Sequence, residues 1–208
     1  MRQIYLDNAA TTRVCPEAAR AALEIMTENY GNPSSSHTMG RAAKAALDKA
    51  RAQVADALGA SDPGEIFFTS GGTEADNWAL LAGAESMRRR GKHIISSLVE
   101  HDAVRKALDE LESRGFEVTR IAPEDNGSIS AGSVAEALRK DTVLVSLMMV
   151  NNETGAITDI AAIAREIKKS GSPALLHTDA IQAFLKVPFS AKTLGADLMS
   201  VSGHKIHA

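Results

Sequence analysis

The sequence predicts an α/β domain with a mostly parallel sheet flanked by helices, and three features of its pattern agree on this. Short apolar segments alternate with amphipathic helical segments from about residue 65 onward. Turn residues separate the two kinds of segment. No repeat, charge block or low-complexity stretch interrupts the alternation. We therefore expect residues 15–208 to belong to one α/β domain and residues 1–14 to form an N-terminal segment.

Composition indicates a soluble globular protein and excludes several classes. Of the 208 residues, 44% are hydrophobic and 24% are charged, and the net charge of −3 gives no reason to expect a nucleic acid as partner. The longest apolar run, residues 143–150, is far shorter than the roughly 20 residues of a membrane helix. The first residues lack a signal-peptide core, so we expect a cytoplasmic location. The single cysteine, Cys15, excludes an internal disulfide.

The first third of the chain predicts two helices joined by a loop. Pro16 stands at a first helical position and begins a helix over residues 16–28. Residues 29–36 are the densest cluster of turn residues in the chain, which predicts a loop. An alanine-rich amphipathic helix is expected over residues 37–58, with Gly59 ending it in the C′ position.

The remaining chain predicts six strands with helices between them. The strands are apolar runs, expected at residues 65–69, 93–97, 115–121, 142–150, 174–177 and 198–201. The helices are expected at residues 73–90, 101–113, 133–139 and 158–169, with a broken helical piece up to about residue 184. Turns are expected at residues 62–64 and 125–127.

Polar residues follow five of the predicted strands. In chain order they are Ser70–Thr73, Glu100–His101, Asn151–Glu153, Asp179 and His204–Lys205. The carboxyl ends of parallel strands meet at one edge of a sheet, and ligands bind beyond that edge in open α/β folds. The sequence therefore predicts a functional site at this edge.

These residue types together suit a phosphorylated aldehyde ring. Gly72 lets the backbone approach a ligand, and the helix that Thr73 opens attracts a phosphate. His101 can stack on a ring, and Asp179 needs a cation such as a protonated pyridine nitrogen. The amine of Lys205 can attack an aldehyde. This combination predicts pyridoxal 5′-phosphate as cofactor.

Each of these residues also has a plain structural explanation. Asn152 and Gln182 can bond a phenolate-type oxygen or a substrate carboxylate, yet Asn-Asn is also common in turns. In purely structural roles, Thr73 would be an N-cap with Asp76 as its capping-box-like partner, His101 a helix-start histidine, Asp179 an N-cap and Lys205 an exposed loop lysine.

Six motifs stand in order along the chain: Tyr5–Thr12, Gly31–His37, Phe68–Asn77, Val150–Glu153, His177–Ala180 and Ser202–Ile206. Together they resemble the cysteine desulfurases, the iron–sulfur-cluster branch of the class V aminotransferases, across the whole chain. The resemblance implies the large pyridoxal-phosphate-binding domain of fold type I enzymes. It also implies a homodimer.

The resemblance implies a role for each candidate residue. Lys205 would hold the cofactor covalently, Asp179 would pair with the ring nitrogen, and His101 would stack on the ring and assist proton transfer. The phosphate would be bound by Gly72, Thr73, Ser202 and His204. The ring oxygen would be bonded by Gln182 and Asn152, and Asn152 would also lie near the substrate carboxylate.

The implied reaction converts L-cysteine to L-alanine and leaves the sulfur on a protein cysteine as a persulfide. The sulfur would then pass to an acceptor or iron–sulfur scaffold protein. Family members continue for about as long again after the lysine, and that part carries the persulfide cysteine and a smaller C-terminal domain. The resemblance therefore implies that residues 15–208 are an incomplete large domain, which alone should be inactive. Cys15 does not match the family nucleophile, and Met149 stands where relatives often have histidine.

Three further interpretations remain beside the desulfurase. The chain could belong to another class V enzyme, such as an aminotransferase or a selenocysteine lyase. It could be a non-catalytic remnant that binds only the cofactor or a partner chain. A metal site is disfavoured because its potential ligands lack a further ligand pattern; they are His177, Asp179, His204 and His207.

Overall fold

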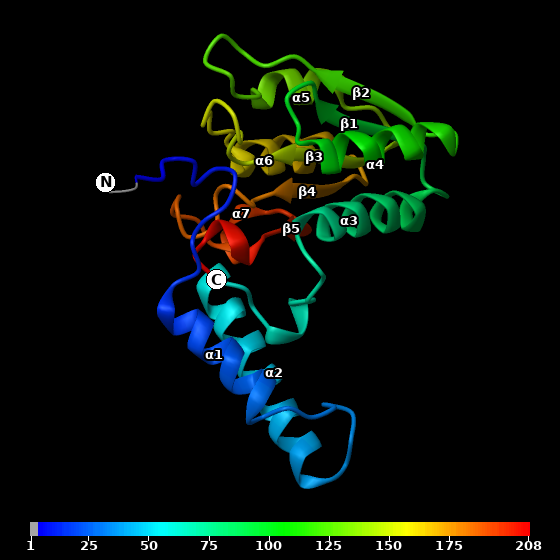
Figure 1. The fold of residues 1–208 in the computed structure, drawn as a ribbon. Helices are drawn as coiled ribbons and strands as arrows, with labels where there is room; N and C mark the ends of the chain where they lie inside the picture. Colours follow the sequence, from blue (N-terminus) through cyan, green and yellow to red (C-terminus); the bar gives the residue numbers. More distant parts are fainter. Residues whose placement is uncertain (1–3) are drawn as a thin grey trace. The chain divides into compact units, whose positions relative to one another are not determined.

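The computed structural model describes residues 4–208, which divide into two compact units (Figure 1). Residues 69–202 form what we call the sheet unit. Residues 4–68 together with residues 203–208 form what we call the helical unit.

The sheet unit contains five parallel strands in the order β2-β1-β3-β4-β5. Their bounds are β1 (His93–Ser97), β2 (Glu117–Ile121), β3 (Thr142–Met148), β4 (Leu175–Asp179) and β5 (Leu198–Ser200). The predicted α/β class with a parallel sheet is therefore confirmed. Parallel strands place all their carboxyl ends at one edge, which fixes where a site can form.

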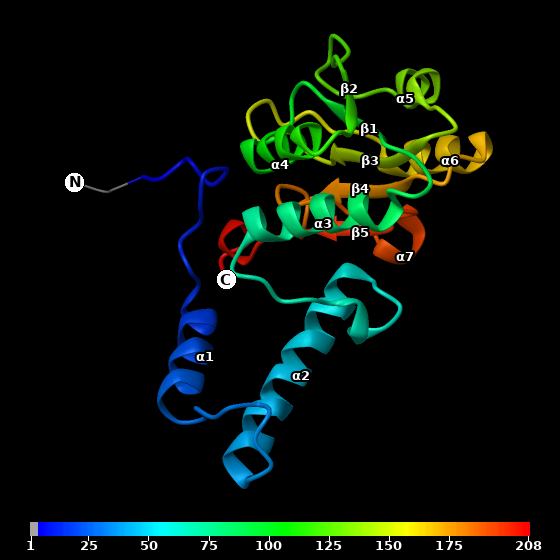
Figure 2. The same cartoon turned by 90° about the vertical axis from the view of Figure 1, so that its right-hand side faces the viewer.

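Five helices accompany the sheet and cover both of its faces, as Figure 2 shows for α4 and α6. They are α3 (Gly72–Met87), α4 (Asp102–Ser113), α5 (Ala131–Ala137), α6 (Ile160–Ser170) and α7 (Ala191–Leu194). Helices α3 and α4 pack on one face, and α5 and α6 pack on the other.

Successive residues of a strand serve the two faces in turn, because side chains alternate along it. Ile94 of β1 belongs to the core cluster under α3 and α4, whereas Ile95 belongs to the cluster under α6. Every residue of β1 and β3 is buried. Burying a side chain of this size contributes about 1.5–3 kcal/mol, so the two layers stabilise the sheet from both sides.

The helical unit holds α1 (Pro16–Thr27), α2 (Thr38–Leu58) and two single 3-10 turns, η1 (Pro63–Glu65) and η2 (Gly203–Lys205). Both α-helices begin and end close to the predicted residues. Helix α2 starts after His37, whose Nδ1 accepts from Gly40 N at 3.3 Å. It ends at Gly59, whose φ of +65° suits glycine.

Thr12 joins the two chain segments of the helical unit. Its backbone N–H and its Oγ1 both donate to the His204 carbonyl, at 2.9 and 2.8 Å. Its Oγ1 in turn accepts from His207 N at 2.8 Å, and Cys15 N donates to the His207 carbonyl at 2.9 Å. Residues 203–208 are therefore held by the segment before α1.

The predicted strand at residues 65–69 is wrong. Glu65 ends η1, and Ile66 is extended but belongs to no strand ladder of the described residues. Phe67 and Phe68 are 67% and 49% exposed, so this apolar run is not a buried strand. An apolar run gives an extended backbone, but a strand also requires a partner, and pairing is set by distant parts of the chain.

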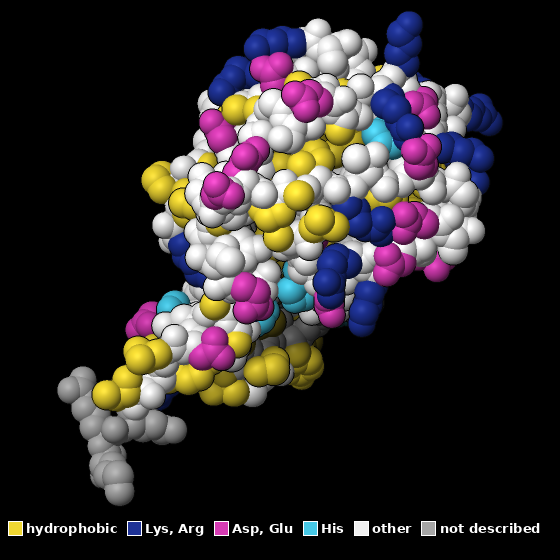
Figure 3. Space-filling view, turned by 90° about the horizontal axis from the view of Figure 1, so that it is seen from above, with side chains coloured by type: hydrophobic (Ala, Val, Ile, Leu, Met, Phe, Trp, Pro, Cys, Tyr) yellow, Lys and Arg dark blue, Asp and Glu magenta, His cyan; other side chains and the backbone are white. Residues whose placement is uncertain are grey.

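The surface of the sheet unit mixes charges of both signs. Figure 3 shows Lys and Arg side chains interspersed with Asp and Glu on the face seen from the side of β2 and α5. Among the described residues, no helix is both long and apolar enough to cross a membrane.

Candidate functional site

Polar residues follow the carboxyl ends of four strands at one edge of the sheet. Glu100 and His101 come after β1, and Asn152 comes after β3. Asp179 is the last residue of β4, and Ser202 comes two residues after the end of β5. The edge predicted from the sequence therefore exists within the sheet unit, although the expected contribution of a strand at residues 65–69 is absent.

Helix α3 begins at this edge with a first turn suited to close approach. A Cβ on Gly72 would lie 2.4 Å from Ile181 Cδ1 and 3.5 Å from Ser202 Cβ, so a larger residue there would displace the end of the Ile181 side chain. The N-cap is Gly71, which has no side chain to bond the first turn. The predicted N-cap at Thr73 is therefore wrong, and Thr73 is the second residue of the helix. A helix N-terminus without a capping side chain attracts an anion.

His101 is the N-cap of α4, and the helix orients its ring. Its Nδ1 accepts from Ala103 N at 3.1 Å. When Nδ1 accepts, a neutral imidazole carries its proton on Nε2. His101 is exposed, so its Nε2–H is a hydrogen-bond donor at the edge of the sheet.

Three carboxyl groups are buried behind the edge. Asp76, Glu100 and Asp179 are 0%, 5% and 5% exposed. Glu100 Oε1 accepts from Ser97 Oγ at 2.5 Å and from Met148 N at 3.2 Å. Among the described residues, Glu100 Oε2 and both carboxylate oxygens of Asp76 have no hydrogen-bond partner.

Burial controls the ionisation of these acids. It raises the pKa of Asp76 to about 8. The charges of Asp179 and Glu100 raise this pKa further, whereas the Ser200 hydroxyl lowers it. Burial likewise raises the pKa of Glu100 to about 8; the bonds from Ser97 and Met148 oppose the rise, and Asp179 adds to it. Asp76 and Glu100 are therefore neutral at pH 7.

His177 of β4 lies beside Asp76 and is also neutral. Burial lowers its pKa to about 3. Its Nδ1 is 2.9 Å from Ser146 Oγ, and its Nε2 is 3.0 Å from Ser200 Oγ and 3.7 Å from Asp76 Oδ1. The contact with Asp76 is therefore no ion pair at neutral pH. Among the described residues, no cluster of three or more His, Cys, Asp or Glu side chains could hold a metal ion.

The two amide candidates differ in their surroundings. Asn152 Nδ2 donates to Glu153 Oε1 at 2.8 Å, while the turn itself is held by Asn151, whose Oδ1 accepts from Glu153 N at 3.0 Å. Gln182 is 9% exposed, and its Oε1 accepts from Lys186 Nζ at 3.0 Å. The Lys186 ammonium group thus orients Gln182, whereas the side chain of Asn152 does not take part in the hydrogen bonds that hold the turn.

His204 and Lys205 belong to the helical unit, where they meet the N-terminal segment. Lys205 Nζ donates to the Ala9 carbonyl and, at 2.7 Å, to the Ala10 carbonyl. His204 Nδ1 lies 3.1 Å from Thr11 Oγ1. In this structure the Lys205 side chain is therefore bonded to the N-terminal segment of the helical unit.

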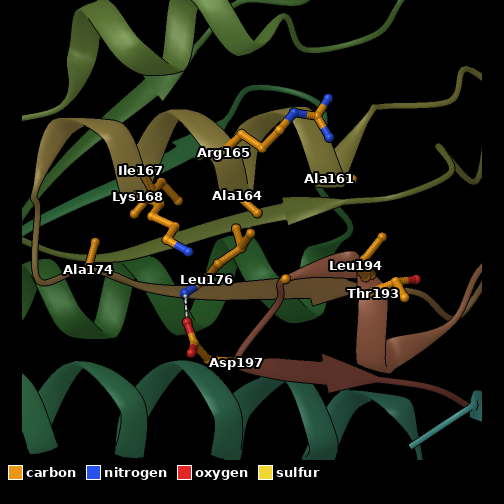
Figure 4. Close-up of a pocket in the computed structure, with 11 residues that line it drawn as sticks. Ala161, Ala164, Arg165, Ile167, Lys168, Ala174, Leu176, Thr193, Leu194 and Asp197 are labelled. Carbon is orange, nitrogen blue, oxygen red and sulfur yellow. Dashed lines mark hydrogen bonds between the residues drawn. The ribbon is translucent and has the colours of Figure 1, made fainter.

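A cavity of about 440 Å³ also lies in the sheet unit, between α6 and α7 with the segment that follows α7 (Figure 4). None of the candidate site residues lines it. Its wall is tied by the bond from Leu176 N to Asp197 Oδ2 at 2.8 Å, drawn in the same view. The lining residues include Ala161, Ala164, Ile167, Ala174, Leu194 and Gly195, with Arg165 and Lys168 as its two cations.

Sequence reasoning overlooked Asp76, which looked like a capping partner for Thr73. A signal existed, because Asp76 falls on the buried face of α3 together with Leu80, Gly83 and Ala84. A carboxylate at a core position of a helix needs an explanation of its own.

Comparisons with known proteins agree with one another. The chain matches the aminotransferase class-V family over residues 4–208. It is 48% identical over 204 residues to cysteine desulfurase IscS of Methanosarcina thermophila, covering 98% of this chain and 50% of that protein. The chain thus spans about half the length of the curated relatives it matches.

Two solved structures share the fold closely. A NifS-like protein superposes with a TM-score of 0.96 at 39% identity, covering 100% of this chain and 56% of the other. The structure described as SspA in complex with cysteine superposes with a TM-score of 0.93 at 35% identity, covering 99% and 58%. On the family match and the shared fold together, this chain belongs to the class-V aminotransferases.

Proposed function

We propose that this chain carries the pyridoxal 5′-phosphate site of a cysteine desulfurase that converts L-cysteine to L-alanine and passes the sulfur on through a protein persulfide. The observation that carries the proposal is the set of polar residues at the carboxyl ends of β1, β3, β4 and β5, beside the N-terminus of α3. The similarity to IscS and to a structure with bound cysteine supports the substrate.

The residues of the sheet unit fit this cofactor in three respects. The first turn of α3 has no side-chain cap, so its backbone N–H groups suit a phosphate. Asp179 is a buried carboxylate at the strand edge, which suits a cationic ring nitrogen. His101 is exposed at the same edge with its ring fixed by Ala103 N, which suits stacking.

Pyridoxal phosphate, when bound, supplies an electron sink for the bonds around the substrate carbon. In the proposal Asp179 keeps the ring nitrogen charged, and His101 stacks and moves a proton through Nε2. Lys205 would hold the group covalently once its amine leaves the Ala9 and Ala10 carbonyls. The phosphate would be bound by Gly72, Thr73, Ser202 and His204, the ring oxygen by Gln182 and Asn152, and the substrate carboxylate in part by Asn152.

The proposal extends to partners. The desulfurase function requires a sulfur acceptor, such as an iron–sulfur scaffold protein, and the family resemblance implies a homodimer. The proposal gives Cys15 no role; its sulfur accepts from Ala18 N at 3.4 Å as the N-cap of α1.

The test is the product formed by the intact protein. With pyridoxal phosphate and L-cysteine we expect L-alanine and sulfide after reduction, and we expect Asp179→Ala to abolish both while Asp125→Ala, in an exposed turn, does not. Transfer of the amino group to a keto acid, without release of sulfur, would instead assign the site to an aminotransferase.

A further inference from the structure

Asn151, which lies shortly after β3, forms hydrogen bonds in two directions and is 8% exposed. Its Oδ1 accepts from Glu153 N at 3.0 Å, from Thr154 N at 2.9 Å and from Thr154 Oγ1 at 3.1 Å. Its Nδ2 donates to the Val99 carbonyl at 2.9 Å and to Met148 Sδ at 3.2 Å. The oxygen of this amide therefore holds the turn after β3, and the nitrogen holds the loop after β1.

The two segments that Asn151 joins each carry a candidate site residue. Asn152 follows Asn151 directly in the turn, and His101 comes two residues after Val99 at the end of the loop. Strands β1 and β3 are neighbours in the sheet, so both segments leave the same edge side by side. One buried side chain thus connects the segment that presents His101 with the segment that presents Asn152.

A second side chain ties the same loop to β3. Glu100 Oε1 accepts from Met148 N at 3.2 Å, and Met148 is the last residue of β3. Beyond this tie His101 begins the approach to α4, and its Nδ1 accepts from Ala103 N. Glu100 therefore fixes the loop against the strand, whereas Asn151 fixes the loop against the turn that contains Asn152.

We propose that Asn151 is a positioning residue whose amide holds His101 and Asn152 in one fixed relation, so that both can act on the same bound ring. The inference rests on the proposed function, because His101 and Asn152 meet the cofactor only in that proposal. Asn151 itself contacts neither the cofactor nor the substrate in it. Groups that act together on one ligand must be held by neighbours whose own side chains are fixed by hydrogen bonds.

The variant Asn151→Asp cuts one of the two links and keeps the other. Its carboxylate retains an acceptor for the backbone N–H groups of the turn, but it places a second acceptor against the Val99 carbonyl. The matched control is Asn126→Asp, because Asn126 Oδ1 also accepts a backbone N–H two residues on, from Ser128 at 2.9 Å, and lies in an exposed turn.

The first measurement uses the intact protein without cofactor. Hydrogen exchange at Ala103 N reports on His101, whose Nδ1 accepts from it. Asn151→Asp should speed this exchange about five- to tenfold, because the loss of a buried hydrogen bond loosens the loop. The control should leave the exchange unchanged. An unchanged rate in Asn151→Asp would overturn the inference.

The second measurement uses the intact protein loaded with pyridoxal 5′-phosphate. Visible circular dichroism per unit of absorbance reports how firmly the protein holds the ring. We expect this signal to fall in Asn151→Asp and to remain in Asn126→Asp, and a full signal in Asn151→Asp would contradict the positioning role. If the unsubstituted protein binds no cofactor, the proposed function fails instead, while the exchange at Ala103 still tests the link.

A further variant and a measurement without substitution keep the test independent of how well Asn151→Asp folds. The hydroxyl of Asn151→Ser can still accept in the turn but is too short to reach the Val99 carbonyl, so both changes should recur. In the unsubstituted protein, the side-chain amide hydrogens of Asn151 should exchange with solvent more slowly than those of the exposed Asn126. Equally fast exchange of the two amides would overturn the inference.

Discussion

The two units of the chain bury their apolar side chains to very different degrees. In the sheet unit every residue of β1 and β3 is buried, and two core clusters fill the spaces under the helices. In the helical unit α1 has no buried residue, and large apolar side chains of that unit are exposed, among them Leu23, Met26 and Tyr30. Burial of apolar side chains should therefore stabilise the sheet unit more than the helical unit.

The largest expected effect comes from a matched pair of leucine truncations. Leu108 of α4 is 0% exposed and Leu23 of α1 is 57% exposed. Leu108→Ala should lower the free energy of unfolding by about 2–5 kcal/mol, because it leaves a cavity in the core. Leu23→Ala should change it by less than about 0.5 kcal/mol. Chemical denaturation measures both, and comparable losses would contradict the difference between the units.

The next effect is the pH dependence of the sheet unit. The folded-state pKa values of Asp76 and Glu100 are raised to about 8, so their contribution to stability is complete below the unfolded values of 3.8 and 4.5 and is lost as pH rises. Near pH 6.5 the two together should lower the unfolding free energy by about 2.7 kcal/mol per pH unit, and this slope should fall to about half that value at pH 8, where each group is half deprotonated. Asp76→Asn should halve the slope near pH 6.5 to about 1.4. Glu136→Gln, on the exposed side of α5, is the control and should leave the slope unchanged.

His177 acts in the opposite direction at acid pH. Its folded-state pKa is lowered from 6.5 to about 3, so its contribution is complete above pH 6.5 and is lost as pH falls toward 3. At pH 5.5 the Asp76→Asn/Glu100→Gln double variant should therefore gain stability with rising pH, whereas the unsubstituted protein loses it. A double variant that still loses stability there would show that other buried acids dominate.

A smaller effect should appear in the helical unit. Thr12→Val removes the hydroxyl that donates to the His204 carbonyl and accepts from His207 N. We expect a loss of about 1–2 kcal/mol, seen as faster hydrogen exchange at Cys15 N, which bonds the same segment. Thr27→Val is the matched control, because its hydroxyl bonds only the Leu23 carbonyl of its own helix at an exposed position. Equal exchange at Cys15 in both variants would contradict the role of Thr12.

Local signals accounted for most of the elements. Pro16 marks the start of α1 and Gly59 marks the end of α2. Both signals depend on backbone geometry that neighbouring residues alone determine. Residues 65–69 were mispredicted because strand pairing depends on distant segments. The one-turn helix α7 is too short to produce a periodic pattern.

The position of the candidate site could be predicted from the sequence, but the burial of its acidic residues could not be predicted in full. The parallel sheet follows from the alternation of elements, and the placement of Asp179 at a strand end follows from the sheet. Helix periodicity could have indicated the burial of Asp76, but its spacing from Thr73 also fits a capping box, and the burial of Glu100 had no such signal because it follows a strand in a loop. Only packing distinguishes a solvated carboxylate from one that must keep its proton.

The most direct test of the proposed site is covalent trapping of the cofactor. The intact protein is incubated with pyridoxal 5′-phosphate, reduced with borohydride and digested, and the modified peptide is sequenced by mass spectrometry. We predict one phosphopyridoxyl group on Lys205, visible absorption before reduction, and loss of both in Lys205→Ala but not in Lys192→Ala. Labelling that persists in Lys205→Ala, or an intact folded protein that stays colourless with the cofactor, would contradict the proposed site.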